Sequence, residues 1–180
     1  SSVSKGMRLN SAATTPTLAS LTFVTNTATW GGGLYLYKTN ATVTDASFFD
    51  NHATSVGGGI LSDEGDPTLI NLTLNGNVAT HRGGGLMAQR SNPTLVNCIL
   101  WGNSADEINR AEIYRDSEST LTIRNSDVRG SGGSASWDAS LGTDDGGNMD
   151  ADPRFVDVAS GDLRLRYDSP AIAAGHSPSV

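Results

Sequence analysis

The sequence predicts an all-β fold, a parallel β-helix, because three independent columns of residues repeat with one common step. Gly33-Leu34, Gly59-Ile60 and Gly85-Leu86 lie 26 residues apart. Two further columns keep nearly the same step, one of asparagine (Asn26, Asn51, Asn77 and Asn103) and one of aliphatic residues (Leu18, Val43, Leu69, Leu95 and Leu121). Several columns that share one period are the sequence signature of a repeat architecture.

Each repeat contains short apolar runs bounded by Gly, Asn and Pro, such as 34-LYL-36, 60-ILS-62 and 68-TLINLTL-74. These runs are too short and wrongly spaced for helices, so we expect strands of a few residues. One such unit cannot bury its own apolar face. Coiling the chain stacks each strand on its equivalent in the next turn, about 4.8 Å away, and buries that face.

Two columns are expected to point inward and form the core: Leu34, Ile60, Leu86 and Ile113, and Phe23, Phe48, Leu74 and Leu100. Cys98 falls in register with Leu72, Ala46 and Leu21, which predicts a small core side chain. A single cysteine also excludes an internal disulfide.

The turns are expected at the glycine triplets 31–33, 57–59 and 83–85, where a sharp bend needs a positive φ without a Cβ. The asparagine column is expected to tolerate the left-handed conformation. Its amides should also bond from one turn to the next, so we interpret this column as a structural ladder.

The period fades after Asn103. Ile113 still corresponds to Leu86, although it comes one residue later than the 26-residue step predicts. The stretch 120-TLTIRNSDV-128 still suggests a strand, but residues 130–147 form a long polar stretch. We therefore expect β-helix coils over residues 1–129, and over 130–180 a polar loop plus a C-terminal capping segment of the same domain. Strands are suggested at 154–157 and 162–167, and this irregular segment would cover the open end, as solenoids require.

The Gly-Gly-aliphatic triplets, alternating with 23-FVTN-26 and 48-FFDN-51, resemble the repeats of the polymorphic outer-membrane protein type of right-handed parallel β-helix. Leu74 and Leu100 depart from its Phe. The tail 147–175 resembles the closing segment of bacterial surface β-helix proteins of the choice-of-anchor type. The resemblance implies a right-handed, single-stranded coil in a secreted or surface-displayed bacterial protein, hence an extracellular or cell-surface location. No secretory signal opens the chain, so an exported form would have lost it or carry it outside this sequence.

Composition excludes several classes of function. The formal net charge of −7 argues against a nucleic-acid or anionic-membrane partner. No window approaches the roughly 18 apolar residues of a membrane span. With 21 glycines and only 17% charged residues, the chain does not resemble a helical bundle.

An enzyme of this fold, such as a polysaccharide lyase or hydrolase, needs convergent carboxylates on neighbouring turns, or a Ca²⁺ cluster beside a basic residue. Asp63 stands opposite Tyr37 and Gln89, so its column holds one carboxylate and not a pair. With Glu64 and Asp66 it forms an acidic bend. We expect no catalytic residue and no cofactor.

Metal sites are equally poorly supported by the sequence. His52, His81 and His176 do not share a column, which argues against a zinc site or a catalytic triad. The acidic stretch Asp144–Asp152 lacks the spacing of an EF-hand, so no metal ligand is assigned and Ca²⁺ there stays an open question.

Two outward columns stand out. The threonines Thr17, Thr42, Thr68, Thr94 and Thr120 suit a stacked sheet, and β-propensity explains them better than ice binding does. The other column is large and apolar, and its members are the candidate partner- or glycan-binding residues: Tyr35, Leu61, Met87 and Tyr114. Such a patch is normally covered. The C-terminal segment could fold over it, another chain could pack there, or sugar rings could stack on the tyrosines.

These observations favour a non-catalytic extracellular structural or adhesive module, with self-association or another surface protein as the expected partner. The alternative is a polysaccharide-active lyase or hydrolase, for which polysaccharide would be the partner. The N-terminal turn begins bare, because Gly6-Met7-Arg8-Leu9 matches Gly33-Leu34-Tyr35-Leu36. We expect a second copy to cover this edge, and a repeated contact of that kind generates a fibre.

Overall fold

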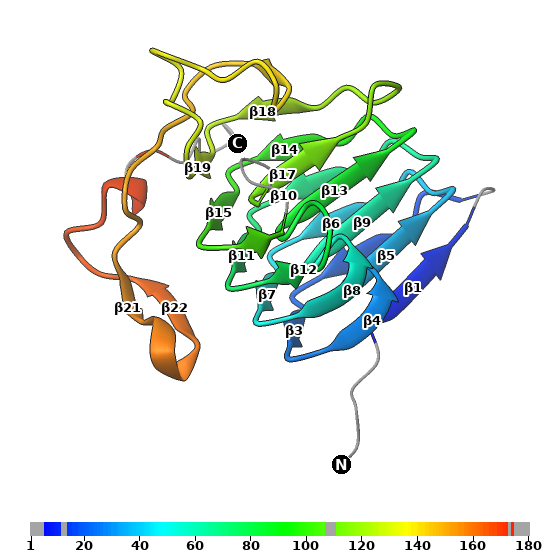
Figure 1. Ribbon diagram of the computed structural model, residues 1–180. Coiled ribbons are helices and arrows are strands. Elements are labelled where there is room, and N and C mark those ends of the chain that lie inside the picture. Colours follow the sequence, from blue (N-terminus) through cyan, green and yellow to red (C-terminus); the bar gives the residue numbers. More distant parts are fainter. Residues whose placement is uncertain (1–5, 12–13, 107–110, 173, 175–180) are drawn as a thin grey trace.

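A computed structural model describes residues 6–11, 14–106, 111–172 and 174. The chain winds into a parallel β-helix, in which successive turns stack along one axis (Figure 1). Each of the first four turns contributes one strand to each of four sheets, which we name A to D in chain order, and the fifth contributes to sheets A, B and C. The expected fold class is confirmed.

The strands are short, and the strands of each sheet come from successive turns. Sheet A contains β1 (Met7–Asn10), β5 (Leu34–Tyr37), β9 (Ile60–Asp63), β13 (Leu86–Gln89) and β17 (Ile113–Arg115). Sheet B contains β2 (Thr17–Ala19), β6 (Thr42–Thr44), β10 (Thr68–Ile70), β14 (Thr94–Val96), β18 (Thr122–Arg124) and β20 (Thr143–Asp144). Sheet C contains β3 (Thr22–Val24), β7 (Ser47–Phe49), β11 (Thr73–Asn75), β15 (Ile99–Trp101) and β19 (Asp127–Val128). Sheet D contains β4 (Thr27–Trp30), β8 (His52–Val56), β12 (Val78–Ala79) and β16 (Ser104–Ala105).

The core lies inside the coil and includes the two predicted inward columns. Leu34, Ile60, Leu86 and Ile113 pair in register, as do Phe23, Phe48, Leu74 and Leu100, and all eight side chains are buried. The rings of Phe23 and Phe48 stack with centroids 4.6 Å apart. Cys98 is buried as expected, and burial raises the pKa of its thiol to about 12.

The fifth turn departs from the predicted step. Leu95 pairs with Ile123 and Thr94 with Thr122, so the expected partners Leu121 and Thr120 are out of register by two residues. One extra residue already precedes Ile113, which pairs with Leu86 one residue late, and the other is accommodated around the turn at Asp116–Ser119, where Ser119 N–H donates to the carbonyl of Asp116. Leu121 remains fully buried despite the shift.

The corners of the coil are built differently from the expectation. Only the first glycine of each triplet has a positive φ, namely Gly31, Gly57 and Gly83. The second and third are needed for space: a Cβ on Gly58 would lie 2.4 Å from the carbonyl oxygen of Gly84. The other three corners use a left-handed residue that is often not glycine, as at Lys38, Asp45 and Asp50.

The asparagine column forms the predicted ladder, but not in the left-handed conformation. The left-handed residues are those just before it (Thr25, Asp50, Gly76 and Gly102). Asn26, Asn51 and Asn77 each donate their side-chain N–H to Oδ1 of the next asparagine at 3.0, 2.8 and 2.8 Å. Side-chain amides therefore link the first four turns, and three of the four asparagines, Asn51, Asn77 and Asn103, are buried.

Parallel pairing extends past Gly130, near which we expected the regular coil to end. β20 pairs with β18 in sheet B, and Met149 bridges Asp127 in sheet C. Between these elements and β19, residues 130–142 form a loop over the end of the core, where Leu141 is buried and Trp137 packs against the core cluster. We call this loop the end cap.

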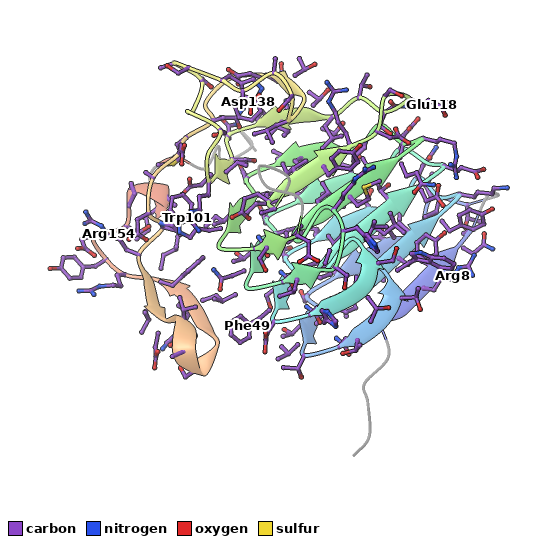
Figure 2. The ribbon with its side chains drawn as sticks, in the orientation of Figure 1. Arg8, Phe49, Trp101, Glu118, Asp138 and Arg154 are labelled. Carbon is purple, nitrogen blue, oxygen red and sulfur yellow. The ribbon has the colours of Figure 1, made fainter. Side chains whose placement is uncertain are left out.

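The C-terminal segment lies elsewhere than predicted. β21 (Phe155–Asp157) and β22 (Asp162–Leu165) form an antiparallel hairpin around η1 (Val158–Ser160), and η2 (Pro170–Ile172) follows. The two expected strands exist, but they lie along the side of the coil beside sheet C and do not cover its end (Figure 1). Figure 2 shows Phe49 and Trp101 pointing from sheet C toward this segment. A Cβ on Gly161 would lie 3.1 Å from the ring of Phe49.

Candidate functional site

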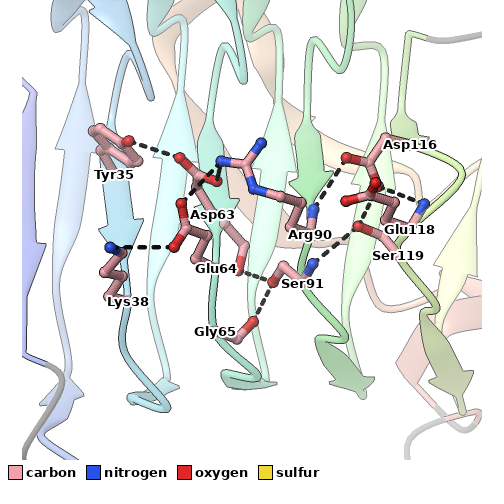
Figure 3. A network of polar contacts seen from close by, with 11 residues as sticks. Tyr35, Lys38, Asp63, Glu64, Gly65, Arg90, Ser91, Asp116, Glu118 and Ser119 are labelled. Carbon is pink, nitrogen blue, oxygen red and sulfur yellow. Dashed lines mark hydrogen bonds and ion pairs between the residues drawn. The ribbon is translucent and has the colours of Figure 1, made fainter.

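The outer face of sheet A carries a connected group of charged side chains, which we name the sheet A network: Tyr35, Lys38, Asp63, Glu64, Arg90 and Asp116 (Figure 3). Each residue follows or lies within a sheet A strand, so the parallel stacking of turns places them side by side. Lys38, Glu64 and Arg90 share one left-handed corner, with φ values of 52°, 55° and 47°. Their side chains lie on the surface at this corner, where each contacts the equivalent residue of the neighbouring turn.

Asp63 is the centre of this network. Its carboxylate accepts a hydrogen bond from Tyr35 at 3.0 Å and another from Arg90 at 2.7 Å, and the residue is only 7% exposed. Burial and the hydrogen bond to Asp63 raise the pKa of Tyr35 to about 12. Asp63 faces Tyr37 and Gln89 as predicted, so the pairing brings no second carboxylate opposite it.

Glu64 binds two cations from neighbouring turns. It lies 3.3 Å from the Lys38 ammonium and 3.1 Å from the Arg90 guanidinium. Burial alone would raise the pKa of Glu64, but Lys38 and Arg90 outweigh it and lower the pKa below its ordinary value. Arg90 is thereby shared by two carboxylates, and Asp116 accepts its backbone N–H at 3.0 Å. The network ties four turns together.

The predicted binding residues Tyr35, Leu61, Met87 and Tyr114 do form one outward row, in register on sheet A. Leu61 is 2% and Met87 5% exposed, so the middle of the row is covered, as we expected of an apolar row of this kind. The reason is the adjoining corner: a Cβ on Gly57 would lie 2.8 Å from the Cβ of Leu61. The glycine corner between sheets D and A therefore packs against this row.

Arginines flank the two ends of this row. The guanidinium of Arg8 lies 4.9 Å from the ring centroid of Tyr35, and that of Arg82 lies 5.0 Å from the ring of Tyr114. The described part of the C-terminal segment packs beside sheet C, so it does not cover this row. A role of these four residues in binding stays a prediction.

Glu112 is a site residue that the sequence did not reveal as such. It occupies the position of Gly33, Gly59 and Gly85 in the last turn, and its carboxylate accepts N–H bonds from Gly102 and from both the backbone and side chain of Asn103. It thus replaces the asparagine that would continue the ladder. Burial raises the pKa of Glu112 to about 7, against the opposing effect of these donors. The break in the glycine column was the available signal.

A cleft of about 770 Å³ opens between β17 and the end cap. Its walls include Glu112, Tyr114, Asp116, Arg129, Asp138 and Leu141. Arg115 crosses from β17 to the cap and donates to the carbonyls of Ser140 and Ala139 at 3.1 and 3.4 Å. The cleft therefore has mixed charge and a backbone edge along one side.

The other residues considered from sequence are not brought together. His52 pairs with Val78, the backbone N–H of His81 bonds to Ser55, and His176 lies outside the described residues. In the acidic stretch, Asp150 accepts the N–H groups of Gly130 and Gly132. Within the described ranges, no group of three or more His, Cys, Asp or Glu side chains is placed to hold a metal ion.

Comparison with known proteins agrees with this geometry. The family model described as "Right handed beta helix region" matches residues 2–145, so the chain belongs to this family. No curated protein and no solved structure matches the chain. In the part of the chain that the structure describes, neither 3₁₀ helix has the length and hydropathy of a membrane span.

Proposed function

We propose that this protein is a non-catalytic structural or adhesive β-helix module of a secreted or surface-displayed protein. The observation that carries the proposal is that the carboxylates of Asp63 and Glu64, on the outer face of sheet A, are engaged in hydrogen bonds and ion pairs. Both carboxylates share Arg90, and each has a further partner, Tyr35 or Lys38. A general base or nucleophile needs a carboxylate oxygen free to reach the substrate. Here the carboxylates act as ties between turns.

A turnover assay tests the proposal directly. We expect the protein to release no new chain ends from a panel of neutral and acidic polysaccharides. Asp63→Asn should leave that result unchanged, while it lowers stability because the bond to Arg90 loses its charge. Turnover by the wild type that disappears in a folded Asp63→Asn variant would overturn the proposal.

The cleft beside β17 favours the alternative, a polysaccharide-active hydrolase. Three carboxyl groups line it, from Glu112, Asp116 and Asp138, and the pKa of Glu112 is raised to about 7. A carboxyl group with a raised pKa suits a general acid. Its oxygens, however, already accept N–H bonds from Gly102 and Asn103. Turnover lost on Asp138→Asn but retained on Asp63→Asn would support this alternative.

Assembly into a fibre is the finer form of the structural proposal. In a parallel coil the first edge of one copy is oriented to extend the last edge of another. The end cap lies over the core at that last edge, so a second coil would have to displace Leu141 and Trp137. Residues 1–5 and 175–180, at the two ends of the chain, lie outside the described residues. Sedimentation velocity across a range of concentrations distinguishes a fibre from a monomer.

A further inference from the structure

Sheet A ends one strand earlier than its neighbour on the same coil. Sheet B continues from β18 to β20, and sheet C continues from Asp127 to Met149, but sheet A stops at β17. The chain that would supply its next strand instead forms the end cap, residues 130–142. The cleft of about 770 Å³ lies between β17 and this cap, at the position of the missing strand.

The backbone of β17 presents unpaired groups to the cleft. In a parallel sheet, alternate residues of a strand bond to alternate neighbours. Leu34, Ile60 and Leu86 each donate their N–H to the following turn. Glu112 and Asp116 bond back to β13 through Leu86 and Ala88. Ile113 and Arg115 therefore direct their N–H and C=O groups toward the cleft, where the described residues supply no strand.

We propose that this cleft binds an extended peptide segment of another protein, which adds to sheet A as a parallel strand beside β17. An unpaired strand edge is a template for such pairing, and main-chain hydrogen bonds supply the affinity. Side chains set the preference. A residue opposite Ile113 would point inward toward Ile113 and Leu141, which are already buried, so it should be aliphatic and would take over the contact that Leu141 makes at the end of the core.

The shape of the cleft favours a flexible segment over a second coil. In a second copy, β1 pairs with β5 and is the first strand of a stack, so it could reach the cleft walled by Asp138, Ser140 and Leu141 only if the whole end cap moved aside. A single extended strand can enter without moving the whole cap. The inference rests on the proposed adhesive function, because it names the kind of partner that such a module would take.

A peptide carrying the sequence of residues 83–91, GGGLMAQRS, is the probe. This segment contains β13, which already pairs with β17 from its other side. With its leucine opposite Ile113, the N–H groups of its methionine and glutamine should donate to the carbonyls of Ile113 and Arg115. Fluorescence anisotropy of the labelled peptide measures binding.

Backbone N-methylation provides the matched control. We expect methylation at the methionine and glutamine to weaken binding about tenfold or more, and methylation at the leucine and alanine to leave it within about twofold. Equal binding by both methylated peptides, or no saturable binding of the parent peptide, would overturn the proposal. Failure here would leave the turnover assay of the proposed function unaffected, so the two can be told apart.

Two protein variants test the location and the source. Ser140→Trp fills the cleft and should abolish binding, while Ala139→Trp, on the same exposed loop but outside the cleft lining, should not. If the methylated peptides behaved as expected but the parent peptide bound both tryptophan variants equally well, the added strand would lie elsewhere and the proposal would be contradicted. Self-association of the protein that the peptide disrupts would make a second copy the occupant, and would overturn the assignment to another protein.

Discussion

Where the repeat ends, single side chains supply the hydrogen-bond partners that the next turn would otherwise provide, and Glu112 is the clearest case. The asparagine ladder needs an acceptor beyond Asn103, and Glu112 supplies it from a position where the other turns carry glycine. The side chain fits because Gly85 shows the space beside the ladder: a Cβ there would lie 3.0 Å from the amide of Asn103. The last turn thus closes the ladder with a carboxylate.

Replacement of Glu112 by glutamine should change how stability depends on pH. The pKa of Glu112 is raised from 4.5 to about 7 by burial, so the folded state holds its proton more tightly than the unfolded chain. The free energy of unfolding should therefore fall as pH rises from about 4.5 to about 7, by about 3 kcal/mol at most from this group. Glu112→Gln removes that contribution.

Urea unfolding of both proteins across this pH range measures the difference. The pKa of Asp127 is also raised by burial, to about 6, and this group contributes a slope of the same sign in both proteins. Only the difference in the free energy of unfolding between wild type and Glu112→Gln, followed as a function of pH, reports the titration of Glu112. A difference that stays constant with pH would contradict the assignment.

Glycines of the same repeat should differ sharply in tolerance. Gly58 has no room for a side chain, because a Cβ would lie 2.4 Å from the Gly84 carbonyl oxygen. Gly76 has a positive φ but room for a Cβ, whose nearest neighbours would lie 3.7 Å away, and Asp50 holds the same corner one turn earlier. Gly58→Ala should cost about 2 to 4 kcal/mol of stability, and Gly76→Asp less than about 1 kcal/mol. Equal losses in chemical unfolding would refute this explanation.

At the scale of elements, the ladder adds side-chain hydrogen bonds between turns that also meet through backbone pairing and core packing. Asn77 is fully buried; its side chain donates to Asn103 at 2.8 Å and to the carbonyl of Phe48 at 2.9 Å, and accepts from Asn51. Removing it leaves donors and acceptors without partners inside the coil. Each buried group left unsatisfied costs about 1 to 3 kcal/mol.

Asn77→Ala should therefore lower the free energy of unfolding by about 3 kcal/mol or more. Asn26→Ala is the matched control, because Asn26 stands in the same column at the end of the ladder and is only partly buried. Its loss should be clearly smaller. Guanidinium unfolding followed by circular dichroism compares the two, and a larger loss at Asn26 would show that the ladder does not stabilise the interior turns.

The strands and the ladder could be predicted from sequence because each side chain meets its own equivalent in the next turn. A regular step is then sufficient to place Leu34 on Ile60 or Asn51 on Asn77. The network around Arg90 could not be predicted in the same way. It depends on a left-handed corner, and residues as different as Lys38, Glu64 and Arg90 share that corner without a common sequence signal.

The whole molecule is a coil with two irregular additions, and the sequence did not determine where these lie. The end cap and the C-terminal hairpin have no repeat to fix their register. Trp137 and Leu141 bring the polar loop onto the core end, so the position that we expected the tail to take is already filled. The tail instead runs beside sheet C, toward Phe49.

Removal of residues 153–180 should leave the coil folded. A two-stranded hairpin is marginal by itself, and the coil has its own core and cap. We expect the far-UV circular dichroism of the coil to persist. Binding of a hydrophobic dye should increase, because Phe49 and Trp101 lose their cover. Global unfolding of the truncated protein would show that the tail is part of the core.

At the left-handed corner between sheets A and B, the backbone conformation does not depend on which side chain the corner residue carries. Lys38, Glu64 and Arg90 share one backbone conformation, yet their charges run positive, negative, positive along the axis. Successive turns are about 4.8 Å apart, so the corner places one side chain on the surface at each such interval. Each of these side chains can be replaced by one of another charge independently of the others. Related coils could therefore exchange one surface pattern for another, and so one partner for another, while the fold beneath stays the same.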